Sequence, residues 1–278
     1  MTSAQKTEER TELDQREQEP EGNGQKKQQK SGPGADKIAR TFARYLIMPV
    51  FLIAVCGALY LWVGSLQLDS IEQRTLNQGY IIQRVVQHLQ LTGVATVLVV
   101  VISVSAGVLF TRDFMSRVSP YIVSVGSIGQ AIPSIGVLAL LAVSGFFGFR
   151  AAIVGLVIYA FLPVLRNTMV GIRQVDSSVI EAGRGMGMTK TAVLFRIELP
   201  LAIPIMLAGI RTALIIVVGT ATLATFINAG GMGDIIVTGI KLSRDSILVT
   251  GSVLTGVLAL TIDYIAGVVE DILRPKGL

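Results

Sequence analysis

The chain has 278 residues, of which 51% are hydrophobic and only 15% are charged, and its formal net charge is +5. A soluble domain carries about a quarter charged residues, so this composition is typical of a membrane protein. Basic residues do not alternate with aromatic residues in a stripe, which argues against nucleic-acid binding.

Residues 1–36 are rich in Gln, Glu, Lys, Gly and Ser, and they hold six basic and eight acidic side chains. They have almost nothing apolar to bury, so we predict a disordered tail. An apolar core followed by a small-residue cleavage site is missing near the start, which argues against a cleaved secretory signal.

Apolar runs dominate the rest of the chain. Spanning a bilayer takes roughly 20 predominantly apolar residues, and six runs qualify in whole or part: about Tyr45–Leu66, Leu89–Phe110, Val118–Phe147, Ala151–Leu165, Leu201–Phe226 and Ser246–Val269. The first belongs to an extra N-terminal transmembrane helix at 37–68, and the polar stretch 69–87 is predicted as an external loop or surface helix. Pro133 is expected to kink or break the third run. The predicted fold class is all-α, a polytopic transmembrane helical bundle of about six spans.

The distribution of Lys and Arg gives the orientation. Six spans put both termini on one side, and with that side cytoplasmic the inside segments hold twelve basic residues against five in the outside loops. Cytoplasmic loops carry an excess of basic residues. We therefore predict a multi-pass protein of the cell membrane with cytoplasmic N- and C-termini.

The longest cytoplasmic loop in this arrangement contains "EAGRGMGMTKTAVLFRIELP", Glu181–Pro200. Asp176 is a candidate helix N-cap before it, a cluster of glycines suits a tight turn, and an amphipathic stretch begins at Thr189 and is expected to stop at Pro200. We predict a helix–turn–helix at 176–200 on the membrane surface, with a face for a partner; a solvated loop is the alternative. The glycines do not have the spacing of a phosphate-binding loop.

This loop resembles the EAA loop of ATP-binding-cassette importer permeases, E-A-A-x₃-G-x₉-I-x-L-P. Six residues match at the motif's spacing: Glu181, Ala182, Gly187, Ile197, Leu199 and Pro200. Gly183 replaces the second alanine, a change that loosens a helix by roughly 1 kcal/mol. The resemblance implies a coupling helix that docks on a cytoplasmic ATP-binding subunit.

The resemblance extends over about 88–278, through "QAIPSIGVLALL", "FLPVLRNTMVGIR", "LPLAIPIMLAGIRTALI", "ATLATFINAGGMGDII" and "RPKGL". These blocks are similar to permeases of importers for glycine betaine, carnitine and choline. The resemblance implies a type I permease core at 88–274, an external substrate-binding protein, and a second permease copy or a sister permease in the lipid bilayer. It implies no chemistry and no cofactor in this chain, and one cysteine, Cys56, with one histidine, His88, argues against a metal site.

Single residues inside the spans carry further hypotheses. Arg211 and Asp263 both lie roughly 16 Å from the cytoplasmic ends of their helices, and we expect them to pair, with independent snorkelling as the alternative. Pro133, Ser134 and Gly136 either form a broken helix that lines the pore or make a packing kink.

Other transport classes compete with this interpretation. An amino-acid importer permease of the methionine type would share the loop. An ion-coupled secondary transporter would show an internal inverted repeat, and a membrane-embedded enzyme would need clustered His, Asp or Glu; the sequence shows neither pattern.

Overall fold

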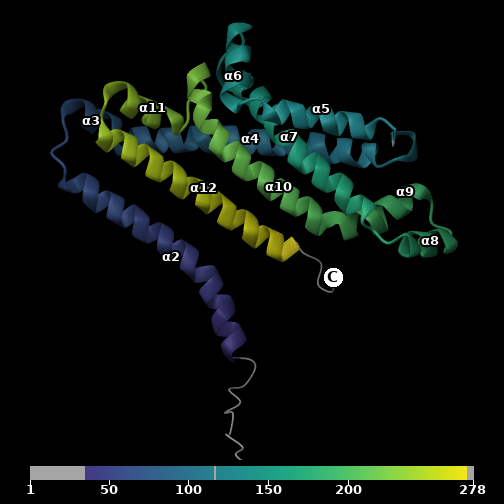
Figure 1. The fold of residues 1–278 in the computed structure, drawn as a ribbon. Helices are drawn as coiled ribbons and strands as arrows, with labels where there is room; N and C mark the ends of the chain where they lie inside the picture. The colour runs from purple at the N-terminus through teal and green to yellow at the C-terminus, as the bar shows by residue number, and fades with distance from the viewer. Residues whose placement is uncertain (1–34, 116, 274–278) are drawn as a thin grey trace, which may run out of the picture. The chain divides into compact units, whose positions relative to one another are not determined.

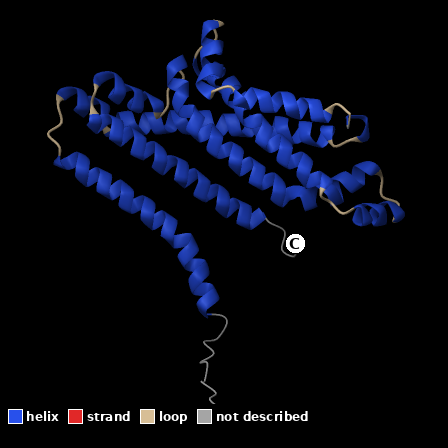
Figure 2. Cartoon of the chain, in the orientation of Figure 1, coloured by secondary structure: helices blue, strands red, loops and turns tan. Residues whose placement is uncertain are grey.

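The structure, a computed structural model, describes residues 35–115 and 117–273. The tail predicted at 1–36 lies outside the described residues except for its last two positions. Every regular element in the described part is a helix, as Figure 2 shows, and the all-α expectation is confirmed. The chain divides into two units, 1–46 and 47–278, and the core belongs to the second.

Five helices are long and apolar enough to cross a membrane, and a bent helix pair raises the number to six. The first is α2, Ala35–Ser65, whose apolar part Tyr45–Ser65 is almost entirely unburied within the chain. The short helix α3, Ser70–Thr75, follows. Asp69 caps it by accepting hydrogen bonds from the N–H groups of Ile71 and Glu72. The bond from Glu72 is the main reason why the pKa of Asp69 lies below its usual value.

The polar stretch 69–87, predicted as an external loop or surface helix, contains helix α3 and the first turns of the next helix. The long helix α4, Gln78–Phe110, begins at Gln78 rather than at Leu89, with Asn77 accepting the N–H of Gly79 at 2.8 Å as its cap. The polar residues of its first turns suggested a loop, but Arg84 and Gln87 find partners in a distant segment. These polar side chains therefore bind other parts of the protein, whereas the local sequence pattern suggested that they are hydrated.

The third predicted span is broken at Pro133, as expected. Helix α5, Ser119–Ala131, and helix α6, Ser134–Val143, meet at an angle of 88°. Ile132 is extended at ψ 129°, the conformation that a following proline favours. A 3₁₀ turn at Asp113–Met115 lies between α4 and α5.

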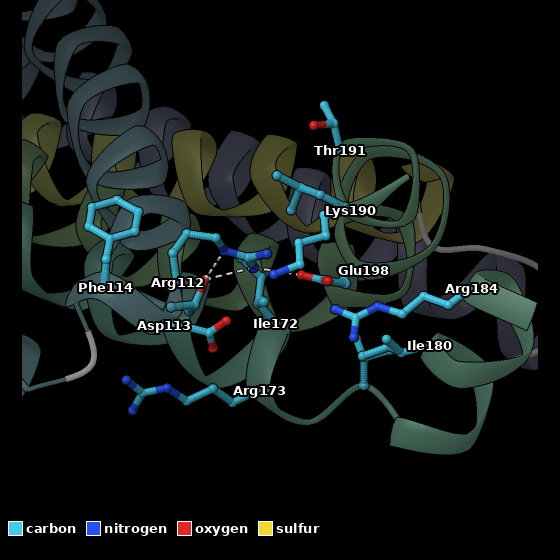
Figure 3. A pocket seen from close by; sticks show the side chains of 13 residues that line it. Arg112, Asp113, Phe114, Ile172, Arg173, Ile180, Arg184, Lys190, Thr191 and Glu198 are labelled. Atoms are coloured by element: carbon cyan, nitrogen blue, oxygen red, sulfur yellow. Dashed lines mark hydrogen bonds and ion pairs between the residues drawn. The ribbon is translucent and has the colours of Figure 1, made fainter. Parts of the chain in front are cut away.

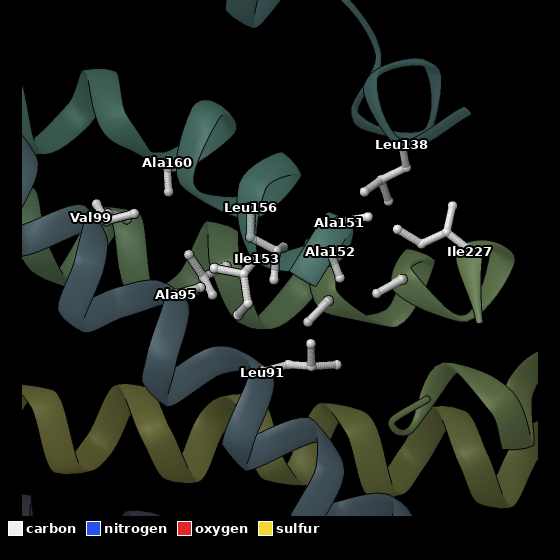
Figure 4. Packing of buried hydrophobic residues seen from close by; sticks show 14 of the residues in the cluster. Leu91, Ala95, Val99, Leu138, Ala151, Ala152, Ile153, Leu156, Ala160 and Ile227 are labelled. Carbon is white, nitrogen blue, oxygen red and sulfur yellow. The ribbon is translucent and has the colours of Figure 1, made fainter. Parts of the chain in front are cut away.

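The core lies where α4, α7 (Gly148–Arg173) and α10 (Leu199–Ala221) pack together. Figure 4 shows small side chains at this contact: Ala95 of α4 and Ala151, Ala152 and Ala160 of α7. Small residues let helix backbones approach closely, which is how membrane helices gain packing energy without a hydrophobic drive between them.

The remaining elements flank this core (Figure 1). Helix α8, Ser177–Gly185, and helix α9, Lys190–Val193, follow α7 and precede α10. A 3₁₀ segment at Thr222–Ile227 ends α10, and α11, Gly233–Leu242, then packs against α12, Asp245–Leu273.

Candidate functional site

The predicted loop at 176–200 consists of two helices joined by a tight turn. The N–H of Ser178 donates to the Asp176 carboxylate at 2.8 Å, caps α8 and lowers the pKa of Asp176. At the other end Gly187 adopts φ +85°, while the N–H of Gly187 bonds to the carbonyl of Arg184 and that of Met188 to the carbonyl of Gly183. These two bonds form a Schellman motif, in which the left-handed position favours glycine. The conformation explains why the motif has a glycine at 187.

Gly183, the departure from the resembled motif, is buried where the two helices of the loop touch. A Cβ atom at this position would lie 2.6 Å from Cδ1 of Ile197 and 3.4 Å from Sδ of Met188. The Ile197 side chain therefore occupies the space of the missing methyl group. At Gly183 the Ile197 side chain thus makes the apolar contact that an alanine methyl group would make. The cost of glycine estimated from helix propensity alone does not include this contact.

Pro200 does not stop the loop's second helix, which corrects the sequence prediction. The chain continues from α9 through a π-helical turn at Leu194–Glu198 into α10, and Pro200 lies in the first turn of α10. Within the turn, the N–H of Leu199 bonds to the carbonyl of Leu194, five residues back. Proline has no N–H and its ring crowds the carbonyl four residues before it, and a wide π-turn just before Pro200 accommodates both effects. The loop thus continues into α10 without a break in helical structure.

One face of the loop is exposed and partly apolar. Glu181 and Ala182 are exposed on α8, and three large apolar side chains are also exposed: Val179 by 42%, Met186 by 76% and Phe195 by 64%. Large exposed apolar side chains on a surface loop suit a contact with a protein partner.

A pocket of about 570 Å³ lies between this loop and the nearby ends of α4 and α7 (Figure 3). Arg112, just past the end of α4, points at Glu198 of the π-turn, with 2.6 Å between Nη2 and Oε2. The sequence analysis did not identify this pair, because 86 positions separate the two residues. In the sequence, Arg112 is only the first charged residue after an apolar run.

The other predicted site residues lie elsewhere. Pro133 and Ser134 lie at the break between α5 and α6, and Gly136 lies in the first turn of α6. Arg211 of α10 and Asp263 of α12 form a bidentate ion pair, with 2.6 Å from Nε to Oδ1 and 2.9 Å from Nη2 to Oδ2. Glu270 adds a second carboxylate 3.5 Å from Arg211.

His88 is a second feature that sequence reasoning missed. Its side chain is fully buried. Nδ1 accepts the N–H of Met232 at 3.4 Å, and Nε2 lies 3.2 Å from the carbonyl of Val218. Because Nδ1 accepts, the ring proton is on Nε2, and the neutral imidazole joins α4 to the end of α10 and to the segment before α11. The nearby pair Arg84–Asp234, at 2.7 Å, makes the same connection.

Comparison with known proteins identifies the class. Residues 100–276 match the family described as the binding-protein-dependent transport system inner membrane component. The carnitine transport permease protein OpuCB of Listeria monocytogenes is 39% identical over 192 residues, which cover 69% of this chain and 87% of that protein. The glycine betaine/carnitine/choline transport system permease protein OpuCB of Bacillus subtilis (strain 168) is 40% identical over 202 residues, covering 73% and 92%. The chain belongs to this permease family and is a multi-pass membrane protein.

Solved structures share the fold. The MetNI methionine ABC transporter in an inward-facing conformation has a TM-score of 0.62 at 24% identity, with 70% of this chain and 96% of that chain covered. An amino acid ABC transporter crystallised with histidines has a TM-score of 0.60 at 19% identity, covering 74% and 100%. The helical bundle is therefore that of a type I importer permease.

Proposed function

We propose that this chain is the transmembrane permease subunit of an ATP-driven importer for quaternary-amine osmoprotectants such as glycine betaine, carnitine and choline. The observation that carries the substrate class is the 39–40% identity to permeases with these substrates in their names, over nearly nine-tenths or more of their length. The osmoprotectant import permease protein OsmY of Salmonella typhimurium, 36% identical over 213 residues, points to the same class.

The coupling role proposed for the loop at 176–200 is supported by its geometry. Glu181 and Ala182 are exposed on α8, a helix whose end is fixed by the Schellman turn at Gly187. The π-turn continues the loop directly into α10. Docking of a cytoplasmic ATP-binding subunit on α8 would therefore displace the start of α10. In this mechanism the partner hydrolyses ATP, and the permease moves between inward-facing and outward-facing states.

The assembly needs further partners. A binding protein delivers the substrate on the external side, and a second copy of the chain or a sister permease completes the translocation path. Both termini are cytoplasmic in this proposal, because the loop must reach the ATPase and because basic residues are concentrated on that side.

Co-purification from the native membrane tests the coupling role. We expect an ATP-binding subunit to purify with the permease, and Glu181→Ala or a bulky residue at Gly187 to release it. Uptake by the assembled importer, measured with a panel of quaternary amines and with methionine, then identifies the substrate. Uptake of methionine alone would favour the amino-acid importer, for which the structural likeness to MetNI supports only the fold.

A further inference from the structure

The ion pair between Arg112 and Glu198 connects the candidate coupling loop to a helix outside it. Its Nη2–Oε2 distance is 2.6 Å, and the Glu198 side chain is only 9% exposed. The Arg112 side chain is 27% exposed, so the cost of separating the pair falls mainly on the Glu198 carboxylate, which would be left buried and uncompensated. The two residues are therefore expected to stay together when the surrounding helices move.

Arg112 is itself fixed against the last turn of α4. Its Nε donates to the carbonyl of Val108 at 3.3 Å and to Oγ1 of Thr111 at 3.2 Å, and its Nη2 also donates to Oγ1 of Thr111 at 2.9 Å. Because these bonds hold the guanidinium before it meets Glu198, little side-chain freedom is lost in forming the pair. The pair thus reports the position of α4 rather than that of a mobile side chain.

Glu198 is placed at the point where the loop becomes a membrane helix. It is the last residue of the π-turn, two positions before Pro200. A π-turn is a common feature of functional sites in helices, and here it interrupts the α-helical hydrogen bonding between α9 and α10. The contact with Arg112 restrains this point from outside.

We propose that Arg112 and Glu198 are positioning residues that couple α4 to the loop at 176–200, so that a displacement of the loop moves α4 and α10 together. This inference rests on the proposed function, since it assumes that the loop is driven by an ATPase. Without the pair, the π-turn would absorb part of the displacement, and ATP hydrolysis would continue with less transport.

The test measures substrate imported per ATP hydrolysed by the complete importer, with its ATPase subunits and binding protein, in lipid vesicles. Arg112→Ala and Glu198→Gln should each lower this ratio at least about fivefold, the low end of the range for coupling between sites. The double variant should be no worse than the poorer single variant, because both remove the same interaction. Glu198→Gln keeps the shape of the side chain and guards against loss of folding.

Arg244→Ala is the matched control. It removes the 2.7 Å ion pair with Asp69, which lies before α3, far along the chain from the loop. It should leave the ratio unchanged. Wild-type import driven by ATP would establish the proposed function whatever the variants do, so the two claims fail separately.

A covalent rescue gives a second readout. In a Cys56→Ser background, Arg112→Cys with Glu198→Cys should have a low ratio, and a short bifunctional thiol reagent should restore it, whereas a reagent with one reactive group should not. Wild-type ratios in both single variants, or a bridged variant that stays uncoupled, would overturn the proposal.

Discussion

At the scale of single residues, the turn at Gly187 shows how one conformation determines the shape of a surface. The residue has φ +85° and open space around it, so a side chain there would meet backbone strain and no steric clash. Gly185, two positions earlier, also has open space but no positive φ. Substituting alanine at the two positions therefore compares a site where only the backbone conformation disfavours a side chain with a site where nothing does.

We expect Gly187→Ala to destabilise the loop by about 1–2 kcal/mol, the cost of a left-handed conformation for an L-residue. Gly185→Ala should be neutral or slightly stabilising, because alanine favours a helix. Limited proteolysis of the loop and retention of the ATPase subunit measure both effects. Equal behaviour of the two variants would contradict the role assigned to the Schellman turn.

At the scale of elements, the segment between α10 and α11 is held by a very close backbone approach. A Cβ atom on Gly233 would lie 1.8 Å from the carbonyl oxygen of Thr222. Backbone atoms cannot move aside as a flexible side chain can, so only glycine fits between the 3₁₀ segment and α11. His88 and Arg84 of α4 fix the same region from the other side.

Gly233→Ala should therefore lower the stability of the purified permease by about 3 kcal/mol or more, at or above the upper end for overpacking. Thermal unfolding in detergent measures the loss. Gly219→Ala on α10, where a Cβ atom would meet nothing within 4 Å, is the control and should not destabilise. A stable Gly233→Ala protein would mean that this segment can adopt another path.

The connection between α10 and α12 depends on Arg211 and Asp263. Arg211→Ala should cost roughly 2–3 kcal/mol, the cost of an unpaired charge within a span. Asp263→Ala should cost less, because Glu270 stays 3.5 Å from Arg211, and the double variant should cost no more than the worse single. Thermal unfolding of the four proteins gives the coupling energy. Additive losses would mean that the two residues act independently. A charge swap is a poorer test, because Glu270, 3.5 Å from Arg211, would face a new carboxylate.

At the scale of the whole molecule, hydropathy predicted the helical bundle and the break at Pro133, because both depend on local properties of the chain. Features that depend on tertiary contacts were missed. Helix α4 starts early because Arg84 and Gln87 are satisfied by a segment more than 140 positions away. Pro200 was interpreted as a stop because a π-turn has no sequence signature, and the pairing of Arg112 with Glu198 has no local signal.

The loop at 176–200 was located from its motif, but the reasons for its residues come from the structure. Gly187 is needed by the turn, and Gly183 leaves space for Ile197. The docking role of the exposed face remains a prediction.

The measurement that tests the central claim most directly is uptake of radiolabelled glycine betaine into vesicles containing this permease, its co-purified ATPase subunit and the binding protein. The account predicts uptake that requires ATP and the binding protein, and that is lost in Glu181→Ala vesicles although the permease remains folded. Uptake by the permease alone, driven by an ion gradient and indifferent to ATP, would contradict the account and favour a secondary transporter.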